Sequence, residues 1–410
     1  MLLRASALKI IKKGENIMKT NLKKILAAIL AISAVVSASG CNIVVDEGSS
    51  STNSSSGVAL ENSSSSNSSS DESSSSNSST NDSTSSTENS SSVESSSNQE
   101  SSSTTENKDP NEGEMSGSIL VLNDGRGIVL YGGGKANGKE YASYLNTIKS
   151  NLANSGNDIN VYSLVSPTAG SYYLPDKYKG YMASEKDNID NINANLSGVT
   201  PVDVYSVFEQ HKSEHIFSRT DHHWQPLGAY YAAQELAKVA GVPFAPLSEY
   251  VEHSYEGYVG TLYGYSKENP KIKNNPEPFT YYSPKCDYTA TFSKTGAEGT
   301  FKEGSLLLPG IFKSAPVSWY LVFIGTDDIV TRVNTTVNNG RKLLIVKDSY
   351  GNAVIPCLLS SFEQVDMVDM RYFKGSVSQY AVENGMTDIV FIMNTFSATG
   401  PNEKKLANII

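Results

Sequence analysis

From residue 118 onward, hydrophobic positions follow two alternating patterns. Short apolar runs typical of buried strands lie at residues 119–122, 127–131, 159–165, 202–205, 342–346, 365–368 and 388–393. Other apolar residues recur at helical spacing, and one such stripe consists of Tyr141, Leu145, Ile148 and Leu152. Strands that alternate with helices in this way predict an α/β fold, in which helices flank a mostly parallel sheet on both faces.

Start and stop signals place the helices along the chain. Gly156 can close the helix of the first stripe, and Ser184 with Asp187 resembles a capping box that opens the next helix. Pro226 suits the first turn of a helix that ends at Gly241. Two further helices are predicted. One follows Ser349 and ends at Leu359, and the other covers residues 377–384.

The stretch of about residues 243–339 breaks the alternation. It is rich in Tyr, Gly and Lys, and its apolar runs, such as 305–308 and 318–324, are short. We therefore expect a β-rich insertion within a domain that spans residues 118–410. Several tyrosines cluster there, and their rigid rings suit stacking on sugars, although most surface tyrosines have no such role.

Composition changes sharply before this domain. Between Ser49 and Ser103, 31 of 55 residues are serine, a composition that cannot form a packed core. Residues 42–117 contain 13 acidic residues and one lysine, a net charge of −12 against −10 for the whole chain, and we predict that they form a disordered, acidic linker. Beyond the N-terminus no region has a stripe of Lys and Arg, which excludes a basic nucleic-acid footprint.

Residues 1–41 have the layout of a signal peptide. Three lysines precede an apolar run at 25–36 that is too short for a permanent membrane span, and we expect translation to start at Met18. The sequence Ala38-Ser39-Gly40-Cys41 then resembles the lipoprotein signal-peptidase site of bacterial lipoproteins. That resemblance implies a lipid-anchored Cys41 and an extracytoplasmic domain. The alternative is ordinary secretory cleavage near Ala38, which leaves Cys41 free.

Two cysteines, Cys286 and Cys357, lie in the folded part. In an oxidising compartment they can pair, but one bridge would be no disulfide framework for a domain of this size. The other interpretation is that both are small buried hydrophobic residues.

The first candidate for chemistry is the segment Thr220-Asp221-His222-His223-Trp224. If it is extended, Asp221 and His223 point the same way and His222 points to the opposite side. A carboxylate beside an imidazole fixes its tautomer, as in a catalytic triad. The alternatives are a structural role, with Asp221 capping the next helix, and a metal site. The latter is disfavoured because adjacent histidines face apart and no second His/Cys cluster exists.

The second candidate is the strand-to-turn sequence Lys347-Asp348-Ser349-Tyr350. Reactive groups of parallel α/β sheets lie beyond the carboxyl ends of strands, where Ser349 would expose its Oγ near backbone N–H groups. Taken alone, Ser349 could equally be an ordinary helix cap.

Together these two segments, with Val368-Asp369-Met370-Arg371-Tyr372, resemble the bacterial family named for its Asp-His-His-Trp motif. That family is related to the SGNH-hydrolase-like domains of alginate O-acetylation proteins. The resemblance implies an SGNH-like sheet and a triad of Asp221 as orienter, His223 as general base and Ser349 as nucleophile. Asp348-Ser349 retains the Asp-Ser pair of the SGNH lipase/esterase type, but the glycine that usually precedes that pair is Lys347 here.

The residues of the implied triad support acyl transfer through an acetyl-serine. Candidate oxyanion or substrate groups are the Ser349 and Tyr350 amides, Arg371 and Asn394, although Arg371 can equally pair with Asp369 and Asn394 can merely cap a loop. The leading hypothesis is a cell-surface polysaccharide O-acetyltransferase. An SGNH-type acetylesterase and a non-catalytic glycan-binding or assembly protein remain as alternatives.

We expect no cofactor, no metal and no nucleic-acid partner. The expected partners are a cell-surface polysaccharide, the membrane through the lipid anchor, and a multipass membrane O-acyltransferase that supplies acetyl groups.

Overall fold

The computed structural model describes residues 109–410. The predicted signal peptide, Cys41 and nearly all of the predicted linker lie outside the described residues. Among the helices that the structure describes, none is both long enough and apolar enough to cross a lipid bilayer.

Within residues 109–410 the largest sheet has eight strands in the order β5-β4-β13-β11-β12-β10-β8-β9. Its parallel part consists of β4 (Asn160–Ser166), β5 (Thr200–Pro201), β11 (Lys342–Lys347), β12 (Gln364–Asp369) and β13 (Asp388–Asn394). The antiparallel part consists of β8 (Tyr288–Ser293), β9 (Lys302–Gly304) and β10 (Val330–Thr335). The prediction of an α/β fold with a mostly parallel sheet is confirmed.

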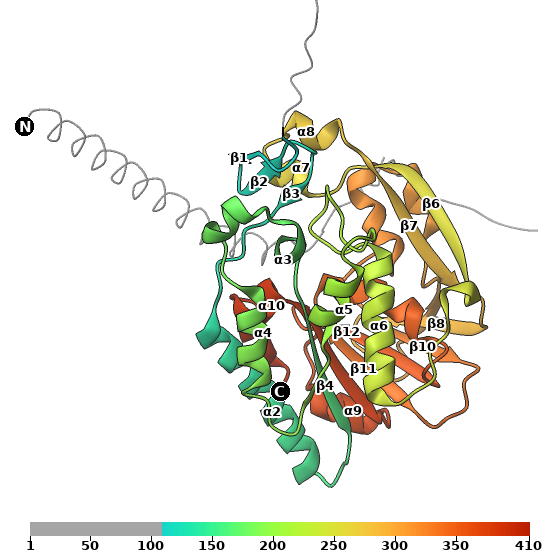
Figure 1. The fold of residues 1–410 in the computed structure, drawn as a ribbon. Helices are drawn as coiled ribbons and strands as arrows, with labels where there is room; N and C mark the ends of the chain where they lie inside the picture. Colours follow the sequence, from blue (N-terminus) through green and yellow to red (C-terminus); the bar gives the residue numbers. More distant parts are fainter. Residues whose placement is uncertain (1–108) are drawn as a thin grey trace, which may run out of the picture. The chain divides into compact units, whose positions relative to one another are not determined.

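Helices cover both faces of this sheet (Figure 1). Along β11, Leu343 and Ile345 pack into the core that contains α5 (Val204–His211) and α6 (Pro226–Ala240). Leu344 and Val346 pack on the other face, in the core formed with α2 (Lys135–Asn154), α4 (Glu185–Asn193) and α9 (Val377–Glu383). This strict alternation follows from the period of two along a strand, and both sets are fully buried because both faces are covered.

The predicted caps form as the sequence indicates. The Ser184 side chain accepts a hydrogen bond from the Asp187 amide at the start of α4. At the end of α6, Gly241 adopts a left-handed conformation with φ 66°, which a glycine reaches without a Cβ clash.

Two local predictions are wrong. The run 202–205 is not a strand, because Asp203 accepts a hydrogen bond from the Ser206 amide and so caps α5. The segment after Ser349 forms two 3-10 helices, η5 (Ser349–Ala353) and η6 (Ile355–Leu358), rather than one α-helix. Pro356 has no N–H for an α-helical bond to the carbonyl four residues earlier, which favours this break.

The segment 243–339 is rich in strands, and part of it belongs to the large sheet. Strands β6 (Tyr250–Tyr258) and β7 (Glu277–Pro284) form a separate antiparallel ribbon, whereas β8, β9 and β10 extend the large sheet. The run 318–324 is mostly 3-10 helix rather than strand. The short helices of this segment are η2 (Leu247–Glu249), α7 (Leu262–Tyr265), α8 (Pro270–Lys273), η3 (Pro309–Lys313) and η4 (Pro316–Val322).

A small antiparallel sheet begins the described chain. It consists of β1 (Gly113–Ser116), β2 (Ile119–Leu122) and β3 (Gly127–Ile128), so regular structure starts five residues before the predicted boundary at Ser118. The other short helices are α3 (Gly170–Tyr173), η1 (Asp176–Tyr181), α10 (Thr395–Thr399) and η7 (Glu403–Asn408). Cys286 and Cys357 are both free thiols, and only Cys357 is fully buried.

Candidate active site

The candidate site lies at the edge of the sheet where the parallel strands end. Ser349 follows β11, Asn394 is the last residue of β13, and Arg371 comes two residues after β12. Because these three strands are parallel neighbours, their carboxyl ends meet at one edge. The loop that carries the Asp-His-His-Trp motif reaches this edge from the start of α6.

Asp221, His223 and Ser349 form a continuous chain of hydrogen bonds. His223 Nδ1 lies 2.7 Å from Asp221 Oδ1, and His223 Nε2 lies 2.8 Å from Ser349 Oγ. The side chains of Asp221 and His223 are almost completely buried, whereas Ser349 is partly exposed. The arrangement has the connectivity of a nucleophile, a base and an orienting carboxylate.

Asp221 is held on its other side by Thr261. The Thr261 amide and hydroxyl both donate to Asp221 Oδ2, each at 2.8 Å. A Cβ at the preceding residue, Gly260, would lie 2.4 Å from the same oxygen, so only glycine allows this approach. Burial alone would raise the pKa of Asp221, but the neighbouring His222 and His223 and these hydrogen bonds hold it well below its usual range.

The motif loop is shaped by a buried carboxylate from β7. Glu277 accepts hydrogen bonds from the Arg219 amide, the Thr220 amide and the Thr220 hydroxyl at 2.6 to 2.9 Å, and also from the Ser218 hydroxyl. At the base of the loop, Phe217 and Trp224 pair as an isolated antiparallel bridge.

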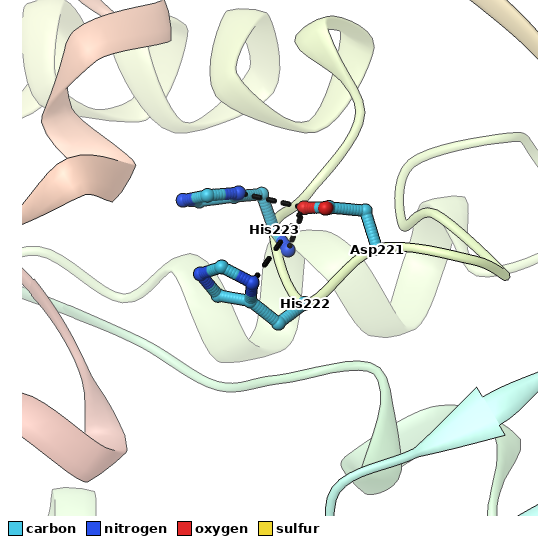
Figure 2. Close-up of side chains that lie close together, drawn as sticks. All are labelled: Asp221, His222 and His223. Carbon is cyan, nitrogen blue, oxygen red and sulfur yellow. Dashed lines mark hydrogen bonds and ion pairs between the residues drawn. The ribbon is translucent and has the colours of Figure 1, made fainter. Parts of the chain in front are cut away.

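This loop is not extended, so the predicted orientation of His222 is wrong. The His222 and His223 rings lie next to each other (Figure 2), with centroids 3.8 Å apart and an interplanar angle of 38°. Each of Asp221, His222 and His223 therefore offers one possible metal-ligating atom, and these three atoms lie within 4.8 Å of one another. A metal ion would have to displace existing hydrogen bonds, because both nitrogens of His223, both oxygens of Asp221 and Nδ1 of His222 are already engaged.

Tyr320 packs on the opposite face of His223. The two rings are almost parallel, with centroids 3.8 Å apart and an interplanar angle of 6°. The Tyr320 hydroxyl donates to the Ser349 carbonyl at 3.1 Å, so one side chain contacts both the base and the nucleophile segment. His223 is thus fixed between two rings as well as by its hydrogen bonds.

The sequence reasoning missed Thr261, Glu277 and Tyr320. All three come from the stretch 243–339, which was expected to be an insertion. No spacing rule connects them with the motif, because Thr261 and Asp221 are 40 residues apart in the chain.

Asp348 organises the turn that carries Ser349. Its Oδ1 accepts the Tyr350 amide at 2.9 Å, and its Oδ2 accepts the Asn394 amide at 3.0 Å. The Tyr350 amide is therefore not a free oxyanion donor, which corrects the sequence-based prediction. The Tyr350 hydroxyl instead donates to the His222 carbonyl at 2.6 Å.

Two of the predicted candidate donors remain open at this edge. The Ser349 amide and the Asn394 side-chain NH₂ make no hydrogen bond with any other residue between 109 and 410. The side-chain oxygen of Asn394 accepts the Ser397 amide and caps α10. Asn394 also lines a small cavity of about 20 Å³, together with His222 and Tyr350. Its volume is near that of one water molecule.

Arg371 is not available to a substrate, and here the ion-pair interpretation holds. Its guanidinium bonds Asp369 Oδ2 at 2.7 Å and Asp327 Oδ2 at 2.8 Å. Lys347, the residue before Asp348, is buried and donates to the same two carboxylates. The Lys347 side chain therefore points into this ion-pair network beneath the nucleophile segment.

Comparisons with known proteins agree with this fold. The family described as "DHHW protein" matches residues 58–368. The crystal structure of a DHHW family protein from Eubacterium siraeum is 43% identical, with a TM-score of 0.67, and the match covers 73% of this chain and 98% of that one. No curated protein matches the chain.

Two solved structures are more distant. Bacillus cereus PatB1 with a sulfonyl adduct is 20% identical over 70% of this chain and 97% of that one, with a TM-score of 0.58, and shares the fold. The O-acetyltransferase domain of Pseudomonas putida AlgJ is 15% identical over 70% of this chain and 91% of that one, with a TM-score of 0.38. The match to the family over most of its length shows that the chain belongs to the DHHW family.

Proposed function

We propose that this protein is an O-acetyltransferase that transfers acetyl groups to hydroxyls of a cell-surface polysaccharide through an acetyl-Ser349 intermediate. The observation that carries the proposal is the hydrogen-bonded chain from Asp221 through His223 to Ser349. A buried, ionised carboxylate orients the imidazole and stabilises its charged form during proton transfer.

In the first half of the reaction, His223 Nε2 takes the Ser349 Oγ proton while Oγ attacks the carbonyl carbon of an acetyl ester. We propose that the Ser349 amide and the Asn394 NH₂, which have no hydrogen-bond partner among residues 109–410, bind the tetrahedral oxyanion. The ester C–O bond then breaks, and the leaving oxygen takes the proton from His223.

In the second half, a sugar hydroxyl gives its proton to His223 Nε2 and attacks the acetyl carbon. The bond to Ser349 Oγ breaks, and Oγ takes the proton back. Water in place of the sugar would give free acetate by the same steps, so transfer and hydrolysis differ only in the acceptor.

The proposal extends to location and donor. We propose that Cys41 carries a lipid anchor and that a multipass membrane O-acyltransferase supplies the acetyl groups. Cys41 lies outside the described residues, and its sequence context is the support for this part.

The test is to incubate the full chain with an acetyl ester and oligosaccharide acceptors, then to quantify acetylated sugar and free acetate. We expect acetylated sugar to dominate, and Ser349→Ala or His223→Ala to lower both products by about 10³-fold or more. Ser155→Ala, at an exposed position after α2, is the matched control. Free acetate as the main product would indicate an esterase, and unchanged products in both variants would leave only a binding role.

A further inference from the structure

The second histidine of the motif supports an inference that rests on the proposed transfer reaction. We propose that His222 Nε2 accepts a hydrogen bond from a hydroxyl of the acyl acceptor, next to the hydroxyl that attacks. The paired rings of His222 and His223 would then select acceptors with two neighbouring hydroxyls, that is, a vicinal diol of a carbohydrate rather than a simple alcohol or water.

The hydrogen bonds of Thr261 fix the tautomer of His222. The Thr261 hydroxyl has one hydrogen, which it donates to Asp221 Oδ2 at 2.8 Å. Its contact with His222 Nδ1, at 2.6 Å, must therefore have the ring nitrogen as donor. A neutral imidazole protonated at Nδ1 presents a lone pair at Nε2, so His222 Nε2 is an acceptor.

His222 also stays neutral. Burial, followed by the proximity of His223, lowers the pKa of His222 to about 3. Its Nε2 makes no hydrogen bond with any residue in the described part of the chain, and the side chain keeps 11% of its surface exposed. Because Nε2 is not among the fully buried unpartnered atoms, this lone pair is open to a donor from outside the protein.

The position of the His222 Nε2 lone pair indicates that it binds the acyl acceptor. Figure 2 shows the outer nitrogens of His222 and His223 on the same side of the two neighbouring rings. The outer nitrogen of His223, Nε2, lies 2.8 Å from Ser349 Oγ. The Tyr350 hydroxyl donates a hydrogen bond to the His222 carbonyl, which fixes the backbone of His222.

The chemistry restricts what can bind there. A lone pair repels the ester carbonyl and the oxyanion, but it accepts an O–H. In the second half of the reaction one hydroxyl gives its proton to His223 Nε2, and the neighbouring hydroxyl donates to His222 Nε2. The His222 and His223 rings are direct neighbours, with centroids 3.8 Å apart, so two hydroxyls that bind their Nε2 atoms must themselves be close together.

The experiment separates this step from acylation. The full chain is acetylated with a chromogenic acetyl ester, and the burst reports acyl-enzyme formation. The acetyl group is then partitioned between a methyl glycoside with a vicinal diol and the matching monodeoxy glycoside. We expect the wild type to prefer the diol by about ten- to hundredfold.

His222→Phe keeps a ring beside His223 but removes the lone pair, and we expect it to lose this preference. His222→Gln places an amide oxygen near the position of Nε2 and should restore part of it, which keeps the test valid if the Phe variant folds poorly. His253→Phe is the matched control, because this histidine also stacks on an aromatic ring but lies on β6.

The outcomes distinguish the two proposals. A normal burst with an unchanged diol preference in both His222 variants would overturn this inference and leave the acetyl-serine mechanism intact. A burst that falls as much in His222→Gln as in His223→Ala would also overturn it, since His222 would then act on the triad. If the wild type shows no burst, the proposed function fails, and this inference fails with it.

Discussion

Two buried carboxyl groups of this protein differ in their pKa, which is lowered for Asp221 and raised for Glu403. Asp221 remains charged because hydrogen bonds from His223 and Thr261 compensate its burial. Glu403 on η7 is also buried, but neither of its oxygens has a hydrogen-bond partner among the described residues. Burial raises the pKa of Glu403 to about 7. The carboxylate that the site uses is thus fully supported, whereas the one outside it is not.

The raised pKa of Glu403 predicts that the protein loses stability as the pH rises. Because its folded pKa of about 7 is above the ordinary 4.5, the folded state holds this proton more tightly than the unfolded state. The stabilisation is complete below pH 4.5 and is lost as the pH rises to 7. We expect Glu403→Gln to remove this loss, so that the free energy of unfolding of the variant, relative to the wild type, increases from pH 4.5 to 7.

Urea unfolding at several pH values measures this difference. Glu303→Gln on the exposed strand β9 is the control, and it should show no such trend. A difference between Glu403→Gln and the wild type that stays constant from pH 4.5 to 8 would contradict the assignment.

At the scale of elements, the ribbon of β6 and β7 supports the motif loop. The β7 residue Glu277 holds the amides of Arg219 and Thr220, directly before Asp221. The loop between the two strands supplies Gly260 and Thr261, which contact Asp221 itself. A ribbon outside the central sheet therefore positions the orienting carboxylate of the triad.

We expect Glu277→Gln to disturb the positions of Asp221 and His223 by loosening the motif loop, without any direct role of Glu277 in the reaction. The substitution leaves an NH₂ group facing amide donors and removes a buried charge, which should cost about 1–3 kcal/mol of stability. The downfield NMR signal of the His223 Nδ1 proton should shift or broaden, a change that a purely global loss of stability would not produce in the folded state. Glu252→Gln, exposed on the neighbouring β6, is the control. An unchanged His223 signal in Glu277→Gln would show that Glu277 does not position the triad.

The sequence predicts the helices better than it predicts the residues that support the motif loop. Helices α2, α4 and α6 carry both an apolar stripe and a terminal signal, such as Ser184 or Gly241, so local physics determines them. The run 202–205 was misassigned because its apolar residues suit either a strand or a helix, and the cap at Asp203 decides between them. Thr261 and Glu277 act through contacts remote in sequence, which no local pattern contains.

At the scale of the whole molecule, the parallel sheet explains why candidate residues from three strands could be predicted to meet, whereas the pairing of Ser349 with Asp221 and His223 was implied only by the family resemblance. The rule that strand ends meet at one edge places Ser349, Asn394 and the segment of Arg371 together. The same rule does not say which groups stay free. Only the packed structure shows that Arg371 is engaged by Asp327 and Asp369, and that the Tyr350 amide is bound to Asp348.

The central claim is that Ser349 carries the acetyl group, and the mass of the protein tests it directly. The full chain is exposed to an acetyl ester, quenched in acid, and analysed by intact mass and peptide mapping. We predict a single added acetyl group on Ser349 in the wild type, none in Ser349→Ala, and formation slowed by about 10³-fold or more in His223→Ala. An unmodified Ser349, or acetylation that proceeds equally in His223→Ala, would contradict the account.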